Sequence, residues 1–146
     1  MIRVFLDANI YFAGCVSSEG ASFCVLELAR RQKIKVFTSK LVLKEADRNL
    51  QQKFPGPVLK SFRRFLQETK IHIVPASEEK DYEPFAAYIH PKDAPVLAAA
   101  IRAQAGYLIT LDRKHFLNPP LLAKVKKPHI LTPGEFLSQV VFKGKL

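Results

Sequence analysis

The chain has 146 residues, 48% of them hydrophobic, which is enough for one compact domain to bury a core without disulfides or a structural metal. Its 23 lysines and arginines against 13 acids give a formal net charge of +10, and so basic a domain favours an anionic partner, most commonly nucleic acid. Because the longest apolar runs, such as PVLAAAI, are far shorter than the ~20 residues of a membrane span, and the N-terminus enters a strand-like run without a signal-peptide pattern, we expect a single cytoplasmic domain over residues 1–146 with no membrane segment.

In the first half of the chain, short strand-like runs alternate with longer helical ones. The predicted elements, in chain order, are a strand at 3–6, a loop of small residues, a helix at about 18–31, a strand at 35–38, and helices at about 40–53 and 58–70. Ser39 is an N-cap candidate for the second helix. The run Pro55, Gly56, Pro57 separates the second helix from the third.

The second half continues the alternation. The predicted elements are strands at 71–74, 107–111 and 129–131, and helices around 85–88, from about 93, and from 133 to about 141. Gly106 fits the C-cap of the helix that begins near Asp93, and Thr132, Pro133 and Glu135 combine the N-cap, N1 proline and N3 acid of a capping box. Short β-branched strands alternating with helices predict right-handed crossovers and a parallel sheet covered on both faces, an α/β fold in three layers.

Three aspartates stand where a strand ends or a helix begins. The apolar run VFL ends at Asp7, the run LITL ends at Asp112, and Asp93 opens the helical run DAPVLAAAIRAQA. A carboxylate at the end of a parallel strand points into the crevice where open α/β folds bind ligands. Because crowded carboxylates repel one another, they need a divalent cation, extra protons, or nearby lysine and arginine. This placement indicates a metal site.

Glu45 is a fourth candidate, on the helix that follows the second strand. It lies at the border of the apolar stripe of that helix and could reach the carboxyl edge of the sheet. Purely structural explanations also exist: Glu45 as an ordinary surface charge, Asp93 as the N-cap of its helix, and Asp112 as the cap of the turn at 113–116. Asp7 has the weakest such explanation, because an aspartate gains nothing from strand propensity.

Basic residues occur in four clusters, RRQKIK, KSFRRF, DRKH and KVKK. KSFRRF reads as a helix with Phe62 and Phe65 facing inward and its basic residues outward. The candidate phosphate-binding residues are those beside the acids and those on this outward helix face: Lys92, Arg113, Lys114, Lys60, Arg63 and Arg64. Each cluster alone fits a solvated surface, whereas the four together favour nucleic-acid binding.

The cysteines and His115 are not expected to carry chemistry. Cys15 and Cys24 show no CxxC or Cys/His spacing, so we expect buried, reduced thiols. His115 has the side chain of a general base, but water activated by a metal makes such a base unnecessary.

The ordered segments VFLDANIYFAG, FTSKLVLKEADRNL, KDAPVLAAAI, LITLDRKHF and ILTPGEFL resemble those of the PIN-domain family of metal-dependent ribonucleases, which includes the toxins of many bacterial and archaeal toxin–antitoxin pairs. The resemblance covers nearly the whole chain and implies a parallel five-stranded sheet. It also implies a homodimer, because family members often form one. It implies that the catalytic, metal-binding cluster consists of Asp7, Glu45, Asp93 and Asp112, supported by hydrogen bonds from Asn9, Ser39 and Thr110. Some relatives carry a further polar or acidic residue shortly after the last aspartate, where this chain has Arg113 to Phe116, so the number of bound metals stays open.

The expected reaction follows from these ligands. Carboxylate oxygens favour Mg²⁺ or Mn²⁺ over Zn²⁺, and such an ion would activate water against a phosphodiester and neutralise the leaving 3′ oxygen. The expected products are 5′-phosphate and 3′-hydroxyl ends. This chemistry does not itself exclude DNA, and RNA as the substrate follows from the resemblance. If the protein is a toxin, an antitoxin should cover the acidic pocket, inserting an arginine as a substitute for the cation.

Two other classes of function are considered. The first is a phosphotransfer enzyme or a response-regulator-like domain, but Asn9 stands where a haloacid-type phosphatase needs a second aspartate, and Val74 to Ala76 stand where a receiver domain needs its phosphoacceptor. The second is an inactive relative that binds RNA or protein through its basic faces. The presence of all four acids favours the nuclease.

Overall fold

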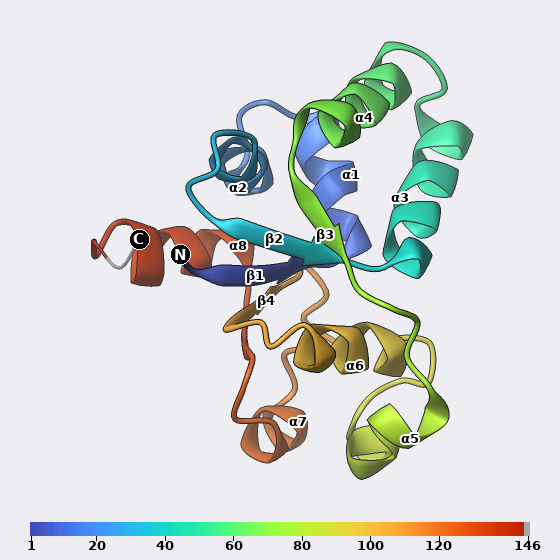
Figure 1. The fold of residues 1–146 in the computed structure, drawn as a ribbon, viewed down its shortest axis with the longest axis vertical. Coiled ribbons are helices and arrows are strands. Elements are labelled where there is room, and N and C mark those ends of the chain that lie inside the picture. Colours follow the sequence, from blue (N-terminus) through green and yellow to red (C-terminus); the bar gives the residue numbers. More distant parts are fainter. Residues whose placement is uncertain (145–146) are drawn as a thin grey trace.

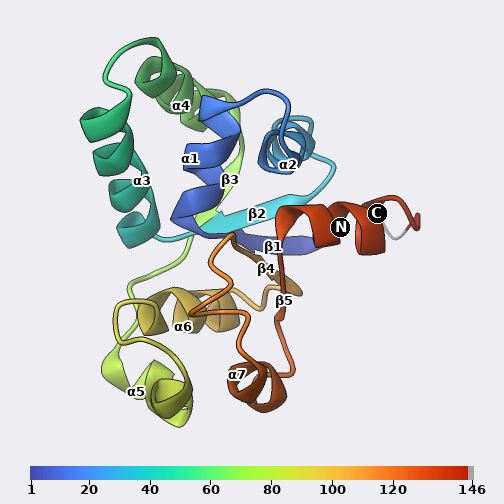
Figure 2. The same ribbon diagram turned by 180° about the vertical axis from the view of Figure 1, so that it is seen from behind.

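The computed structural model describes residues 1–144 of the chain. Its centre is a sheet of five parallel strands in the order β3-β2-β1-β4-β5 (Figures 1 and 2). The strands are β1 (Arg3–Leu6), β2 (Lys35–Thr38), β3 (Ile71–Ile73), β4 (Tyr107–Ile109) and β5 (His129–Leu131). Val4 of β1 pairs with Val36 on one side and with Tyr107 on the other. The predicted five-stranded parallel sheet is confirmed.

Helices cover both faces of the sheet. They are α1 (Ala8–Val16), α2 (Ala21–Arg30), α3 (Lys40–Lys53), α4 (Pro57–Glu68), α5 (Glu79–Tyr82), the 3₁₀ segment η1 (Glu83–Tyr88), α6 (Ala94–Arg102), α7 (Pro119–Lys124), and α8 (Pro133–Phe136), which continues as the π-helical turn η2 (Leu137–Val141). Helices α1 to α4 lie on one face, and α5 to α7 lie on the other (Figures 1 and 2). The prediction of three layers is therefore confirmed.

The central strand β1 explains where the site forms. Val4, Phe5 and Leu6 have no exposed surface, as expected for a strand covered on both faces. From β1 the chain first builds outward through β2 to β3 and then returns to place β4 on the opposite side of β1. Helices leave the neighbouring strands β1 and β4 toward opposite faces, so a crevice opens beyond their carboxyl ends.

The prediction of a loop of small residues after the first strand is wrong, because Ala8–Val16 forms helix α1. Asp7 caps this helix by accepting a hydrogen bond from Ala8 N. The helix buries Ala8, Ile10, Tyr11 and Gly14, and its other residues up to Cys15 are half-buried, so it has no exposed polar face. A helix buried on several sides lacks the periodicity by which helices are predicted.

Several boundaries also differ from prediction. Gly106 is not the C-cap of α6, because that helix ends at Arg102, and the left-handed conformation that follows belongs to Gln104, with φ of 55°. Gly106 N instead donates a hydrogen bond to Arg3 O. The short helices α5 and α7 were not predicted. The N-cap at Ser39 and the capping box of Thr132 and Glu135 are confirmed.

Both cysteines are free. Burial raises the pKa of the half-buried Cys15 thiol to about 11. Cys24 is exposed on α2, so the prediction of a buried thiol is wrong there. It lies on the face of α2 opposite Val25 and Leu26, which pack into the core.

Among residues 1–144, no single helix is long and apolar enough to cross a membrane. Helices α1 and α2, which meet at an angle of 101°, reach the length and apolar composition of a membrane span only when the two are counted together. Both helices bury residues in the core of the domain.

Candidate metal and nucleic-acid site

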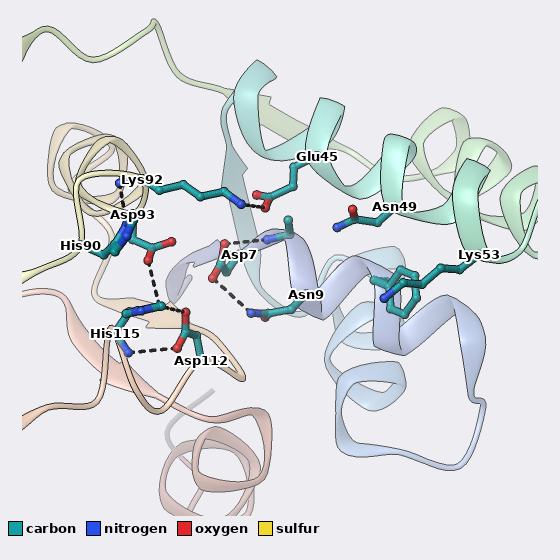
Figure 3. A pocket seen from close by; sticks show the side chains of 12 residues that line it. Asp7, Asn9, Glu45, Asn49, Lys53, His90, Lys92, Asp93, Asp112 and His115 are labelled. Carbon is teal, nitrogen blue, oxygen red and sulfur yellow. Dashed lines mark hydrogen bonds and ion pairs between the residues drawn. The ribbon is translucent and has the colours of Figure 1, made fainter.

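The carboxyl ends of β1 and β4 open into a pocket of about 480 Å³. Four acids from separate parts of the chain line it: Asp7 follows β1, Asp112 follows β4, Glu45 lies on α3, and Asp93 stands directly before α6. Figure 3 shows their side chains around this common space. The structure thus brings together all four acids singled out in the sequence, at the topological switch point of the sheet.

Asp7 is the most buried of the four, with 6% of its surface exposed. Its Oδ1 accepts a hydrogen bond from Ala8 N, and its Oδ2 accepts one from the Thr110 hydroxyl, each at 2.8 Å. Burial raises the pKa of Asp7 to about 6, with further contributions from Glu45 and Asp93, although the two hydrogen bonds oppose the shift. A cation in the pocket would favour the charged form of this carboxyl group.

The Thr110 hydroxyl connects the two strand-end aspartates. It donates to Asp7 Oδ2 and accepts from Asp112 N at 3.0 Å and from Asn9 Nδ2 at 3.3 Å. Asn9 Nδ2 also lies 3.3 Å from Asp7 Oδ2, and Asn9 Oδ1 accepts from Leu111 N at 3.1 Å. The two polar neighbours Asn9 and Thr110 therefore fix the segment after β4 against the segment after β1.

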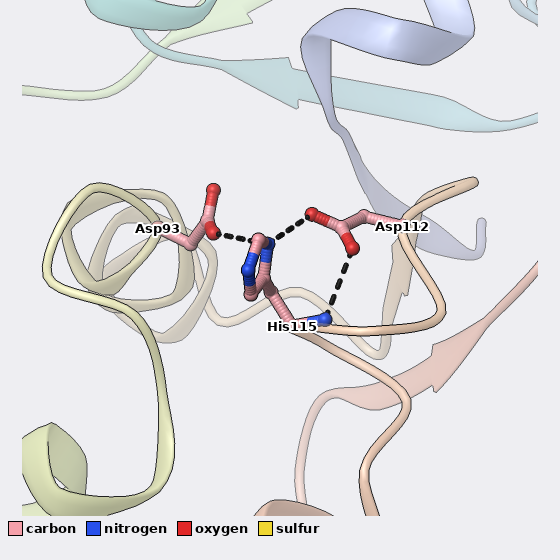
Figure 4. Close-up of side chains that lie close together, drawn as sticks. All are labelled: Asp93, Asp112 and His115. Carbon is pink, nitrogen blue, oxygen red and sulfur yellow. Dashed lines mark hydrogen bonds and ion pairs between the residues drawn. The ribbon is translucent and has the colours of Figure 1, made fainter.

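Asp93 and Asp112 face each other across the His115 ring (Figure 4). His115 Nδ1 lies 2.9 Å from Asp112 Oδ2 and 3.2 Å from Asp93 Oδ2. Asp112 also uses Oδ1 to accept from His115 N at 3.0 Å, so it does cap the turn that follows it. Asp93 occupies an N-cap position but makes no side-chain capping bond. Burial and then the neighbouring Asp112 raise the pKa of Asp93, whereas the two nearby histidines oppose the shift.

Glu45 faces the pocket from α3. Its Oε1 lies 3.8 Å from Lys92 Nζ, which reaches across from the segment before α6 (Figure 3). Ser39 stands farther from the acids and lines a separate pocket with Ile73 and Pro95. Its hydroxyl accepts from Val42 N at 3.2 Å, so it contributes to the helix that carries Glu45 by capping that helix.

One end of the pocket is formed by residues that the sequence analysis missed. Asn49 and Lys53 continue the α3 face that begins with Glu45, and Phe12 of α1 lies beside them. Lys53 Nζ lies 5.5 Å from the centre of the Phe12 ring, and the rings of Phe12 and Phe54 are 5.9 Å apart. The spacing of four residues from Glu45 to Asn49 to Lys53 was the available signal, since residues four apart share a helix face.

The predicted basic residues lie at different distances from the acids. Lys92 lines the pocket itself, and Arg113 and Lys114 are exposed directly after Asp112. Lys60, Arg63 and Arg64 lie on the exposed face of α4 outside the pocket. The guanidinium group of Arg63 binds both carboxylate oxygens of Asp47 at 3.1 Å, which partly occupies it.

The donor set fits a hard divalent cation. Four carboxyl groups share the pocket, and within residues 1–144 Lys92 is the sole lysine or arginine within 4 Å of any of them. The pKa values of Asp7 and Asp93 are both raised, partly by the neighbouring acids. Carboxylate oxygens that are crowded and poorly neutralised are the ligands that Mg²⁺ and Mn²⁺ prefer.

The sequence matches the profile of the PIN domain over residues 3–114. That match spans most of the chain and all four acids, so the protein belongs to the PIN-domain family. A search of curated proteins found no match.

Solved structures with a similar fold include a toxin and a chain of a VapBC structure. The protein resembles one chain in the structure of VapBC2 from Rickettsia felis bound to a promoter DNA fragment. The TM-score is 0.60, the identity is 18%, and the match covers 89% of this chain and 97% of that one. It resembles PAE2754 from Pyrobaculum aerophilum, with a TM-score of 0.65, 15% identity and coverage of 97% and 96%. It also resembles VapC20 from Mycobacterium tuberculosis, a toxin that cleaves the sarcin–ricin loop, with a TM-score of 0.54, 14% identity and coverage of 76% and 91%.

Proposed function

We propose that the protein is a metal-dependent endoribonuclease that hydrolyses RNA to 5′-phosphate and 3′-hydroxyl ends. The observation that supports this most directly is that Asp7, Glu45, Asp93 and Asp112 line one pocket at the carboxyl edge of the sheet. These four acids would hold Mg²⁺ or Mn²⁺. When bound, the metal would supply an activated water and neutralise charge on the leaving oxygen.

The surrounding residues support this function by position. Thr110 and Asn9 hold the carboxyl group of Asp7 and the segment of Asp112 in fixed orientation. Lys92, which lines the pocket, would bind a phosphate of the strand being cut. Arg113 and Lys114 would bind flanking phosphates, and Lys60, Arg63 and Arg64 would extend the basic track over α4.

The cellular role we favour is that of a toxin with an antitoxin protein as partner. Two of the similar folds are a VapBC2 complex and a toxin that cleaves the sarcin–ricin loop. An antitoxin would cover the acidic pocket and offer a positive side chain to the four carboxyl groups. We further propose that the protein acts in the cytoplasm as a homodimer. Sedimentation of the purified protein would test the dimer.

The test is cleavage of a 3′-labelled single-stranded RNA with Mn²⁺, with Mg²⁺, or with EDTA. We expect cleavage that requires metal, with a 5′-phosphate on the downstream product. Asp7→Asn, Asp93→Asn and Asp112→Asn should each reduce the rate at least about 100-fold.

A matched pair on α3 provides the control. Glu45→Gln removes a carboxylate that faces the pocket, whereas Asp47→Asn removes one that pairs with Arg63 outside it. Only the first should lose activity. Undiminished cleavage by Asp93→Asn, or cleavage in EDTA, would contradict the proposal. RNA binding without cleavage would favour the inactive binding module.

A further inference from the structure

His115 stands between two of the acids in a way that its sequence position did not predict. The ligand atoms of Asp93, Asp112 and His115 all lie within 4.8 Å of one another, and all three side chains are partly buried (Figure 4). They come from two separate segments, one entering α6 and one leaving β4. An imidazole nitrogen thus lies between carboxylate oxygens of two of the four acids that line the pocket.

The spacing of the atoms fits coordination of one ion. Cis ligands at ~2.1 Å from an octahedral ion lie ~3.0 Å apart. His115 Nδ1 lies 2.9 Å from Asp112 Oδ2 and 3.2 Å from Asp93 Oδ2. A metal ion in place of the Nδ1 proton would therefore need little rearrangement of these three side chains.

The other hydrogen bonds of Asp93 and Asp112 leave an oxygen of each carboxyl group available to bind a metal ion. Asp112 Oδ1 is held by His115 N, so Oδ2 is the oxygen that faces the ring. Asp93 makes no capping bond to α6, so its carboxyl group is not tied to the helix terminus. His90, whose ring centre is 5.1 Å from that of His115, is less suited to bind metal. Its Nδ1 accepts a hydrogen bond from Lys92 N, which places its proton on Nε2.

We infer that His115 is a metal ligand that acts with Asp93 and Asp112, and that its nitrogen gives the pocket a preference for first-row transition ions over Mg²⁺. Imidazole binds transition ions well, whereas Mg²⁺ favours oxygen ligands and retains its waters. This inference rests on the proposed metal-dependent function and narrows the choice of cofactor from Mg²⁺ or Mn²⁺ to Mn²⁺.

Pulsed electron paramagnetic resonance of the protein loaded with Mn²⁺ alone tests the ligand directly. We expect ¹⁴N coupling from a bound imidazole in the wild-type protein and in His90→Gln, and no such coupling in His115→Gln. Coupling that persists in His115→Gln would overturn the assignment, and so would its absence from the wild-type protein. If His115→Gln misfolds, the spectrum of His90→Gln still tests the assignment, because coupling retained there cannot come from His90, the other histidine that lines the pocket.

Calorimetric titration with Mn²⁺ and with Mg²⁺ tests the preference. The ratio of the two affinities should fall about tenfold in His115→Gln and stay unchanged in His90→Gln. An equal loss of both affinities in His115→Gln would contradict the inferred preference.

These measurements do not depend on catalysis, so they separate the two proposals. Binding of Mn²⁺ without ¹⁴N coupling overturns the role of His115 and leaves the nuclease proposal standing. Coupling in a protein that cleaves no RNA supports the ligand and overturns the nuclease. A wild-type pocket that binds no divalent ion overturns both.

Discussion

The side chain of Asp7 is buried, and it has no basic partner within 4 Å among residues 1–144. Its pKa rises from 3.8 to about 6 in the fold, mainly through burial. Below pH 3.8 the carboxyl group is protonated in both the folded and unfolded states, and the fold pays no penalty. Between pH 3.8 and 6 the unfolded chain ionises this group while the folded protein keeps it protonated, so the destabilisation grows with pH and reaches about 3 kcal/mol above pH 6 when metal is absent.

We therefore predict that Asp7→Asn stabilises the metal-free protein at pH 7.5 by about 1 to 3 kcal/mol while it abolishes cleavage. Asparagine keeps the acceptor for Ala8 N, but its amide nitrogen cannot accept the hydrogen bonds that Thr110 and Asn9 donate to Asp7 Oδ2, so the gain is smaller than the full cost of ionisation. Urea unfolding in EDTA would measure the gain. The gain should shrink as the pH is lowered toward 4, and a gain that is independent of pH would show that ionisation is not its cause.

At this scale the sequence revealed the four acids but not all their neighbours. Asp7 and Asp112 were predictable because the ends of parallel strands meet at one edge of a sheet. The Asp93–His115–Asp112 contact was not predictable, because it depends on how the turn after Asp112 folds back toward α6. The chemical roles of all these residues remain proposals.

At the scale of the element, α3 presents one face to the pocket and another to solvent. Lys53 lies on the pocket face beside Phe12, whereas Lys44 is exposed on the same helix away from the pocket. This arrangement predicts that Lys53 binds the RNA backbone while Phe12 contacts a base.

In an Asp7→Asn background that prevents cleavage, Lys53→Ala should weaken binding of single-stranded RNA roughly fivefold at low salt. It should also reduce the slope of log affinity against log salt by about 0.7, as expected for one lost phosphate contact. Lys44→Ala is the control, and it should change the RNA affinity and the salt slope less than Lys53→Ala does. Fluorescence anisotropy over a range of salt concentrations would measure both, and equal effects of the two substitutions would exclude a specific contact.

Close packing of α1 against α2 depends on Gly14. A Cβ added at Gly14 would overlap Leu26 Cδ1, whereas one added at Gly134, in the first turn of α8, would meet nothing within 4 Å. Gly14→Ala should lower the free energy of unfolding by about 1 to 3 kcal/mol through overpacking. Gly134→Ala should leave it unchanged or raise it by up to about 1 kcal/mol. Chemical denaturation of both variants would check this, and a neutral Gly14→Ala would mean that Leu26 moves aside without cost.

The elements were predictable to the extent that each has one buried face. Helix α3 alternates buried Val42, Ala46 and Leu50 with exposed positions, and its predicted range agrees with the structure. Helix α1 does not alternate in this way, so its sequence pattern predicts a loop instead of a helix. The short helix α7 has a recognisable start, since Asn118 caps it ahead of two prolines, but it is too short to show helical periodicity.

For the whole molecule, binding of a metal ion should stabilise the fold, because the ligands meet only when the sheet is assembled. A Mn²⁺ concentration 100-fold above its Kd would add about 2.7 kcal/mol and raise the melting temperature by roughly 5 to 10 °C. Asp93→Asn should lose most of this shift, and Asp47→Asn, outside the pocket, should retain it. Differential scanning calorimetry with and without EDTA would measure the shift. A shift that Asp93→Asn retains would place the ion elsewhere.

The order of the strands has a consequence for how the protein is made. β4 is inserted next to β1 at the centre of the sheet, although more than a hundred residues separate Asp7 from Asp112 along the chain. A growing polypeptide on the ribosome therefore lacks the last acid of the pocket until residue 112 has been synthesised. If the proposed nuclease activity is correct, fragments that end before β4 should not cleave RNA, even when they contain every residue up to the end of α6.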